Sequence, residues 1–475
     1  VTFGNINADV AYYTPDSLNR ENRTFSVHGV SYGFTQVVLT AGDQTVVYYV
    51  NVIPSDRGVS KVAPMVSSGQ KYQLALKSDG TVWAWGDNSY GQLGRTVDPQ
   101  QSYSMLPVQV EFPGLASGEY IKSISAGEYH ALALTSEGRL YAWGDNRSSQ
   151  LGLRLTWGFT GDQVEPDKLA TPAVVTLSKT AAGADARVAK MVAGISHSAI
   201  LTESGRVYTW GTNTVGQLGI GAATGYKTGI PQLVSGMSKV IDLSEGAKGD
   251  TVRVVRYDGT MWAWGQNTNR QINTVSGQQN YASPIIMKLD FANLEGAVKD
   301  EQGHAYALPD GARILRVVDG QKFSTAMLSN GRVIAWGANE TGQLGSTSAR
   351  ESGETNANAP YYVDGFDGED GSQYAVALSS GATHTLALTA DQYVWTWGSN
   401  AEGRLGQNDA AEREVPVQVM ETEAVLRDGV YKISFRTDES GNPIPMRAQL
   451  VSAGGASSAV GAIRPTDNGN GFTAG

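Results

Sequence analysis

The chain has 475 residues with 57 glycines, a formal net charge of −10 and no cysteine, which excludes thiolate metal sites, iron–sulfur clusters and thiol chemistry. A hydrophobic fraction of 41% beside 17% charged residues is typical of a folded chain, not a disordered one. The acidic balance disfavours nucleic acid as a partner, and no apolar run of about 18 residues is present that could insert into a membrane.

The first 54 residues form a segment of their own. Residues 34–39 and 45–52 alternate apolar and polar side chains around a turn at Gly42-Asp43, which predicts two strands. The segment resembles the last strands of a bacterial immunoglobulin-like module, whose complete sandwich needs about 100 residues. We therefore expect 1–54 to be a partial immunoglobulin-like β segment. The rest of the module would lie upstream, or the strands would pack on the following domain or a neighbouring subunit.

A repeated pattern begins after residue 55. The dipeptide Trp-Gly recurs at intervals of 54 to 72 residues, which is the spacing of a repeat architecture with variable loops. Its tryptophans are Trp85, Trp143, Trp210, Trp264, Trp336 and Trp397. Each is preceded by two apolar runs of strand length and an intervening turn, which in five units ends in glycine and predicts a hairpin. A tail such as Gly91-Gln92-Leu93-Gly94 follows, and four strands per unit is the natural count.

Taken together, these motifs resemble the regulator of chromosome condensation family. The shared pattern is Ser-x-Gly-x-x-His, a Leu-x-Leu strand, an acidic-Gly turn, and then Trp-Gly-x-Asn-x-x-Gly-Gln-Leu-Gly. The resemblance implies an all-β fold, a seven-bladed β-propeller of four-stranded blades around a central channel, over residues 55–475. The repeat cores are expected near 66–94, 121–152, 188–219, 240–273, 314–345, 375–406 and 450–475.

The seventh unit is degenerate. It retains Val451-Ser452-Ala453-Gly454 but lacks the tryptophan and the tail. We expect a strand from residues 59–64 to complete this blade and close the ring.

The candidates for catalysis or metal binding are few. His130, His197 and His384 occupy one slot of the repeat, which Tyr72 and Phe323 fill elsewhere, so packing is the favoured interpretation. The recurring tryptophans are likewise interpreted as core between blades. No catalytic or cofactor-binding residue is predicted. The one weak metal candidate is an acidic loop that would suit calcium, containing Asp364, Asp367, Glu369 and Asp370.

Long insertions specific to single blades are the better candidates for function, because loops on rigid scaffolds carry binding. Three insertions contain aromatic residues that could anchor a partner or fold back on their own blades. These residues are Trp157, Phe159, Tyr281, Tyr361 and Tyr362.

The sequence favours a non-catalytic scaffold outside the cell or at its surface. The propeller would present its loops to a protein, a glycan or copies of itself, which includes assembly into an oligomer or filament. The alternative is a regulator of a partner protein, either a nucleotide-exchange factor for a GTPase, as the resemblance implies, or an inhibitor of a secreted enzyme. An enzyme with its site at the channel mouth is the third hypothesis.

Overall fold

The computed structural model places most of the chain. It describes residues 2–4, 11–13, 27–29, 33–41, 44–52, 61–62, 64–96, 102–154, 165–177, 187–221, 225–244, 249–257, 260–274, 277–301, 305–366, 374–427, 430–448, 450–454 and 458–461. No helix among these residues is long and apolar enough to cross a membrane.

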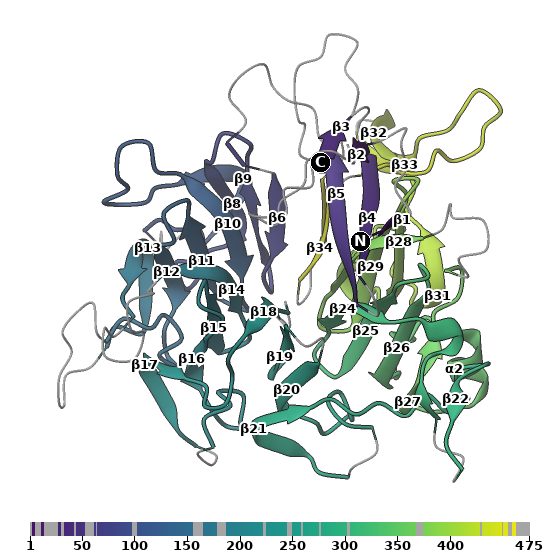
Figure 1. Cartoon of the computed structure of the whole chain (residues 1–475). Helices are drawn as coiled ribbons and strands as arrows, with labels where there is room; N and C mark the ends of the chain where they lie inside the picture. The colour runs from purple at the N-terminus through teal and green to yellow at the C-terminus, as the bar shows by residue number, and fades with distance from the viewer. Residues whose placement is uncertain are drawn as a thin grey trace.

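Six antiparallel four-stranded sheets, the blades, follow one another around a central axis (Figure 1). Blade one holds β6 (Met65–Ser68), β7 (Tyr72–Leu76), β8 (Val82–Asp87) and β9 (Tyr103–Val110). Blade two holds β10 (Ile121–Ala126), β11 (His130–Thr135), β12 (Leu140–Asp145) and β13 (Lys168–Val175). Blade three holds β14 (Val188–Ala193), β15 (His197–Thr202), β16 (Val207–Thr212) and β17 (Lys227–Leu233).

The second half of the ring repeats this order. Blade four holds β18 (Val240–Leu243), β19 (Thr251–Arg256), β20 (Met261–Gln266) and β21 (Asn280–Ile286). Blade five holds β24 (Ile314–Asp319), β25 (Phe323–Leu328), β26 (Val333–Ala338) and β27 (Asn356–Tyr362). Blade six holds β28 (Ala375–Ser380), β29 (His384–Thr389), β30 (Val394–Gly398) and β31 (Arg413–Gln418). The predicted propeller of four-stranded blades is confirmed.

The Trp-Gly motif has a backbone reason. In blade one the register between the third and fourth strands shifts between Ala84 and Gly86, and Gly86 has a φ of +101°. A Cβ at Gly86 would collide with the backbone of Lys71 and Tyr72, so only glycine fits there. The same shift recurs at the glycine after each of the other five tryptophans.

The tryptophans form the contact between blades. Trp143, Trp210, Trp264, Trp336 and Trp397 are fully buried. Each indole Nε1 donates a hydrogen bond of 2.7–3.1 Å to the carbonyl oxygen of a glutamine in the tail of the preceding blade. The predicted role of these residues as core between blades is therefore confirmed.

The ring is completed by a smaller unit. Strands β34 (Leu450–Ala453) and β35 (Ser458–Gly461) form a two-stranded sheet that contacts β6 of blade one, while β34 also contacts β28 and β29 of blade six. Figure 1 shows β34 between these two blades. Among the described residues the seventh position thus holds two strands, and the number of four-stranded blades is six instead of the expected seven.

Residues 59–64 were expected to supply the strand that closes the ring. The described residues of that segment contact blade one instead. The backbone N–H groups of Lys61 and Val62 donate to the carbonyl oxygen of Ser78, in a turn of blade one, and residues 61, 62 and 64 form no strand. The closing contacts come from β34 instead. The N–H of Ser68 donates to Ser452 Oγ at 3.0 Å, and Ser68 Oγ donates to the Ser452 carbonyl oxygen at 3.1 Å.

The remaining elements lie outside the blades. Strands β1 (Thr2–Gly4), β4 (Gly33–Ala41) and β5 (Gln44–Val52) form one sheet, and β2 (Ala11–Tyr13) pairs with β3 (Val27–Gly29). The two strands predicted near 34–39 and 45–52 are therefore present, but these pairings do not show an immunoglobulin-like module. Two further hairpins and three short helical segments are described: β22 (Val298–Lys299) with β23 (Ala305–Ala307), β32 (Thr422–Arg427) with β33 (Val430–Phe435), η2 (Pro309–Gly311), α2 (Thr347–Glu351) and η3 (Ala401–Gly403).

Candidate binding surface

One end of the propeller is formed by two sets of loops, which we call the loop face. The loop after the first strand of a blade lies beside the loop after its third strand, because alternate antiparallel strands end on the same side. A backbone hydrogen bond of 2.8–3.0 Å joins the two loops in all six blades. Its donors are the N–H groups of Asp87, Asp145, Thr212, Gln266, Ala338 and Ser399.

Side chains of the repeat hold these loops rigidly. In every blade the asparagine three residues after the repeat tryptophan, such as Asn88, accepts a hydrogen bond through Oδ1 from the N–H five residues further on, at 2.8–3.2 Å. In five blades the tail glutamine, such as Gln92, accepts one through Oε1 from the N–H two residues earlier. Backbone N–H groups of each loop are therefore bonded to side chains of the same loop, which leaves the outward side chains on a pre-organised support.

The loop face of blades one and two carries a cluster of Tyr90, Tyr129 and Arg147. The rings of Tyr90 and Tyr129 lie 5.1 Å apart between centroids at an angle of 52°. The Arg147 guanidinium lies 4.2 Å from the centre of the Tyr90 ring, a cation–π contact. Both tyrosines are half-buried, and the Arg147 side chain is about half exposed. Tyr and Arg held at a rigid, partly exposed position are the residue types that dominate protein interfaces.

One aspartate, Asp145, orients the arginine of this cluster. Asp145 Oδ1 accepts a hydrogen bond from Arg147 Nε at 2.8 Å, while its Oδ2 accepts one from Gln150 Nε2 at 2.9 Å. The bond to Asp145 raises the pKa of Arg147, so its charge is fixed. Burial, together with the nearby Glu128 carboxylate, raises the pKa of Tyr129, so its hydroxyl stays protonated and able to donate at neutral pH.

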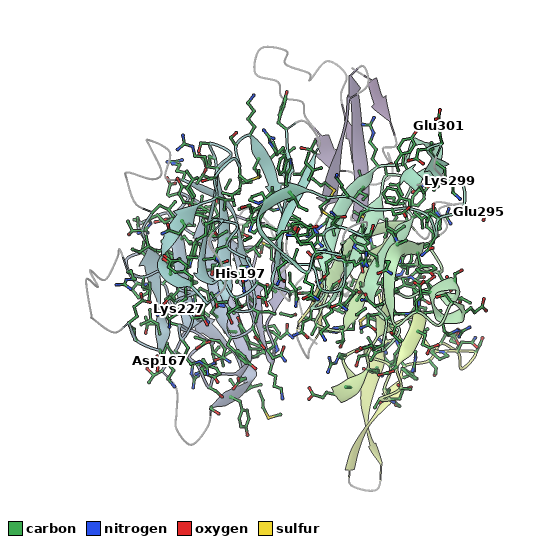
Figure 2. The ribbon with its side chains drawn as sticks, turned by 90° about the horizontal axis from the view of Figure 1, so that it is seen from below. Asp167, His197, Lys227, Glu295, Lys299 and Glu301 are labelled. Carbon is green, nitrogen blue, oxygen red and sulfur yellow. The ribbon has the colours of Figure 1, made fainter. Side chains whose placement is uncertain are left out.

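Lysines from the outer strands complete the surface. Lys168 Nζ donates to the Ser89 carbonyl oxygen at 3.1 Å, and Lys227 Nζ donates to that of Arg147 at 2.9 Å. Figure 2 shows Lys227 and Asp167 at the rim of the molecule, with His197 further inside. Each lysine ties the fourth strand of one blade to the loop of the preceding blade.

The histidine slot is structural, as predicted. His130 Nε2 lies 3.0 Å from Ser198 Oγ in the next blade, and His384 Nε2 lies 2.8 Å from Ser458 Oγ in β35. All three histidines are buried, and each belongs to a different blade. No group of three or more His, Asp or Glu side chains that could hold a metal ion occurs among the residues that the structure describes.

Three of the five aromatic residues proposed as possible anchors lie among the described residues. Tyr281 and Tyr361 belong to the outer strands β21 and β27, and both are 7% exposed. The Tyr281 hydroxyl accepts a hydrogen bond from Asn273 Nδ2 at 3.1 Å, and Tyr361 packs into the core of blades five and six. Tyr362 is half-buried under the Arg332 guanidinium. These rings therefore fold back on their own blades, while Trp157 and Phe159 lie outside the described residues.

The candidate calcium loop is described only at its start. Asp364 Oδ2 accepts hydrogen bonds from the N–H and hydroxyl of Thr347, at 3.0 and 2.5 Å, and thereby holds the start of α2. Asp367, Glu369 and Asp370 lie outside the described residues. The described carboxylate already has a structural role.

The RCC1-like domain model matches residues 35–440, which is most of the chain and includes all six blades. The chain belongs to the RCC1-like domain family. Among similar proteins, the Arabidopsis thaliana ultraviolet-B receptor UVR8 is 28% identical over 77% of this chain and 70% of its own length. The Mus musculus ubiquitin ligase HERC2 is 28% identical over 74% of this chain, which spans only 6% of HERC2.

Solved structures support the same fold. Yeast RCC1 (Prp20), in its complex with Kap60, has a TM-score of 0.62 at 19% identity, covering 85% of this chain and 81% of that one. Human WBSCR16 has a TM-score of 0.61 at 20% identity, covering 86% and 87%. At this identity the likeness establishes the RCC1-like fold alone.

Sequence reasoning missed the cluster of Tyr90, Tyr129 and Arg147. Tyr90 and Arg147 sit at variable positions between the asparagine and glutamine of the tail, and Tyr129 sits at a variable position directly before the histidine slot. A search for aromatic residues at the variable positions of consecutive blades would have found the two tyrosines.

Proposed function

We propose that this RCC1-like propeller is a non-catalytic protein-binding module that recognises its partner through the loop face of blades one and two. The observation that carries the proposal is the cluster of Tyr90, Tyr129 and Arg147, oriented by Asp145 on loops that satisfy their own hydrogen bonds. Such an arrangement places large, rigid contact groups at an interface with little loss of conformational entropy on binding.

Relatives support a binding or regulatory role. UVR8 is a receptor, and structures of Prp20 were determined in complex with Kap60 and alongside measurements of binding to Gsp1p and histones. We therefore propose, more specifically, that the propeller controls the activity of the protein that it binds. Stimulated nucleotide release from a purified small GTPase would support it, whereas binding without any change in the partner's activity would favour a scaffold.

Location outside the cell remains a proposal from the sequence. Its support is the resemblance of the N-terminal strands to a bacterial immunoglobulin-like module. Self-association and glycan binding are further forms of the same proposal. Light scattering on the native protein would detect oligomers, a glycan array would detect carbohydrate binding, and fractionation of the source cells would establish location.

The proposed surface is tested with a double variant, Tyr90→Ser with Arg147→Ala. Neither side chain lies in the core, so the fold should persist and the thermal unfolding midpoint should change little. We expect quantitative affinity capture from source-cell extracts to recover a partner with the wild-type chain and lose it with the double variant. A matched control is Lys322→Ala on the loop face of blade five. Equal recovery by all three proteins would contradict the proposal.

A further inference from the structure

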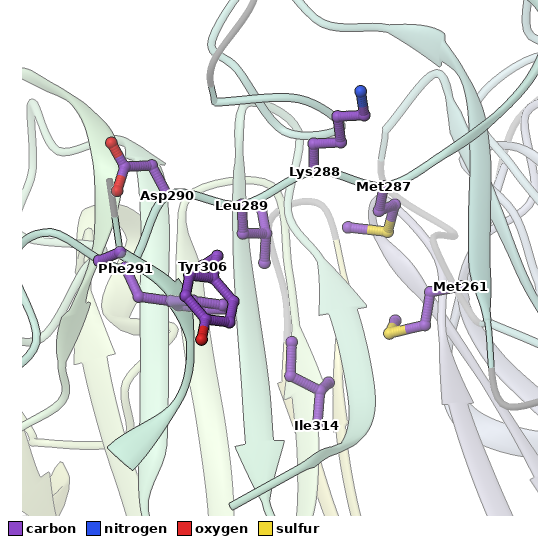
Figure 3. Close-up of a pocket in the computed structure, with 9 residues that line it drawn as sticks. Met261, Met287, Lys288, Leu289, Asp290, Phe291, Tyr306 and Ile314 are labelled. Atoms are coloured by element: carbon purple, nitrogen blue, oxygen red, sulfur yellow. The ribbon is translucent and has the colours of Figure 1, made fainter. Parts of the chain in front are cut away.

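A cavity of about 500 Å³ lies between blades four and five, at the end of the blades opposite the loop face. Its apolar wall combines residues of both blades with the chain that connects them (Figure 3). The lining includes Met261, Met287, Leu289, Phe291, Tyr306 and Ile314. In Figure 3, Met261 and Met287 lie on one side, and Phe291 and Tyr306 lie on the other.

The same positions are closed at the other seams between blades. The first residue of the third strand is Met261 here, and its equivalents are at most 2% exposed: Val82, Leu140, Val207, Val333 and Val394. The first residue of the next blade is Ile314. At the other four seams between two four-stranded blades its equivalents are at most 4% exposed: Ile121, Val188, Val240 and Ala375. Met261 and Ile314 are only half-buried, so this seam is open where the other seams between two four-stranded blades are packed.

A third position shows the same difference. Met287 follows the fourth strand and donates its N–H to the Met261 carbonyl oxygen at 2.9 Å. Val234, Val363 and Val419 make the same bond in their own blades and are at most 5% exposed, whereas Met287 is half-buried. Two methionines thus replace smaller aliphatic residues at the opening. Methionine is flexible and polarisable, which suits a surface that adapts to a partner.

The connection between these two blades builds the far wall. Residues 287–313 link blade four to blade five, whereas residues 234–239 suffice between blades three and four. The added chain contains the β22–β23 hairpin, which supplies Tyr306. Phe291 and Leu294 of this connection pack into the core of blade five with Trp336, so the wall is anchored to the propeller.

The apolar surface extends beyond the cavity. Tyr306 is 62% exposed and Tyr257, in the turn that precedes β20, is 73% exposed. Ile286 and Val298, on β21 and β22, are also exposed. A small molecule that filled 500 Å³ would leave these side chains in water, whereas a protein segment would cover them.

Charges of both signs surround this apolar area. Lys288 and Asp290 flank Leu289, and Glu295, Lys299 and Glu301 are exposed on the connection, where Figure 2 shows them close together. An apolar centre with a polar rim is the usual anatomy of a protein interface. A membrane surface or a nucleic acid would instead select a uniformly basic rim.

We propose that this cavity and the exposed residues around it, the blade-four groove, form a second docking site. Its occupant is a segment of a partner protein that inserts two or three large apolar side chains and carries flanking charges of both signs. Tyr306 at the edge of the cavity and Val298 outside it contact the partner, and Met261 and Met287 adapt to the inserted side chains. The site is separate from the loop face and does not depend on the function proposed for it.

The probe is a library of random 12-residue peptides selected on the full chain, followed by methyl NMR of the nine methionines with the selected peptides. We expect peptides with two or three large apolar residues, and shifts confined to the methyl groups of Met261 and Met287. The variant Val298→Ser with Tyr306→Ser should weaken binding by tenfold or more, because exposed interface anchors are lost without disturbing the core.

Two controls separate the possible outcomes. Met105→Ser, at an 82% exposed methionine of blade one, should leave the peptide affinity unchanged. The loop-face variant Tyr90→Ser with Arg147→Ala should also bind the peptides normally, so failure of one proposal is distinguishable from failure of the other. Peptide shifts away from Met261 and Met287, or equal binding to Val298→Ser with Tyr306→Ser, would overturn the second docking site.

Discussion

At the scale of single residues, one hydrogen bond explains why the repeat needs both tryptophan and glutamine. The tryptophan of one blade inserts into the seam, and its indole N–H reaches the glutamine carbonyl oxygen of the blade before it. Trp85 of blade one is the exception, since it is half-buried and its indole has no such bond among the described residues. The seventh unit, which precedes blade one in the ring, has no recognisable Gln-Leu-Gly tail to receive it.

Trp143→Phe is therefore expected to cost more than Trp85→Phe. The first change leaves the buried Gln92 carbonyl oxygen without its donor and creates a small cavity, a loss of about 2–4 kcal/mol of unfolding free energy. The second change removes a half-buried ring with no such bond and should cost about 1 kcal/mol. Urea unfolding of both variants measures the difference. Equal losses would show that the indole bond contributes little.

His197 should make stability depend on pH. Burial lowers its pKa, although the Asp250 carboxylate, 3.8 Å away, opposes this effect. The folded state therefore binds a proton less readily than the unfolded state, whose histidine has a pKa of about 6.5. Stability is unaffected by this group above that pH and falls as the pH drops below it.

His197→Phe, which copies Phe323 of blade five, should weaken this dependence. Unfolding midpoints of wild type and variant between pH 7.5 and 5 provide the measurement. The free-energy difference between the two proteins should shift in favour of the variant as the pH falls. Parallel curves over this range would show that another group is responsible.

At the scale of elements, blades four and five are joined by a buried ion pair. The Arg253 guanidinium contacts Asp319 and donates to the Gln271 carbonyl oxygen at 2.7 Å and to Ser324 Oγ at 3.0 Å. Ser324 in turn donates to Asp319 at 2.7 Å. Burial lowers the pKa of Arg253 to about 9, which still leaves it charged at neutral pH. Leucine stands at the Arg253 position in three other blades, and alanine stands at the Asp319 position in three other units.

Breaking this pair on one side should be worse than removing it. Arg253→Leu leaves the Asp319 carboxylate buried without its partner, at an expected cost of about 3–5 kcal/mol. The double variant Arg253→Leu with Asp319→Ala copies the apolar seams and should recover most of that loss. The free energy of unfolding in denaturant is measured for the wild type, both single variants and the double variant. A double variant no more stable than the worse single variant would contradict the argument.

At the scale of the whole molecule, the ring closes through one seam that differs from the rest. Ser452 bonds the N–H of Ser68 in the same way that Ser125 bonds that of Ala193, at 3.0 Å in both cases. The same serine-to-backbone hydrogen bond is thus present at both seams. At the closing seam, however, Ser452 belongs to the two-stranded β34–β35 sheet and not to a four-stranded blade. A smaller sheet buries less apolar surface, so this seam should open first.

Native-state hydrogen exchange should show this directly. We expect the Ser68 amide to exchange faster than the Ala193 amide. Ser452→Ala should accelerate exchange at Ser68 by roughly fivefold, which corresponds to the loss of about 1 kcal/mol of hydrogen bonding. Ser125→Ala is the matched control, and it should act on Ala193 alone. Equal protection of the two amides in the wild type would mean that the closing unit is as stable as a complete blade.

The sequence by itself determined the propeller and the positions of its blades. The backbone conformation of each blade and its contacts with the next blade require particular residues at fixed positions of the repeat. These residues are Trp-Gly, the turn glycines and the Asn-x-x-Gly-Gln-Leu-Gly tail, and they can be recognised within a single repeat. The histidine slot was correctly interpreted for the same reason, because a position that also accepts Phe323 must serve packing.

Only the tertiary structure decided where the surfaces lie. Tyr90, Tyr129 and Arg147 come from two blades, and the blade-four groove combines strands with the connection between blades, so no single stretch of sequence reveals either one. Burial is also decided in three dimensions, which is why Tyr281 and Tyr361 fold inward on strands β21 and β27, although the sequence pattern assigns them to long insertions. A repeat specifies its contacts with the next repeat, whereas a binding surface arises where variable side chains of several elements meet.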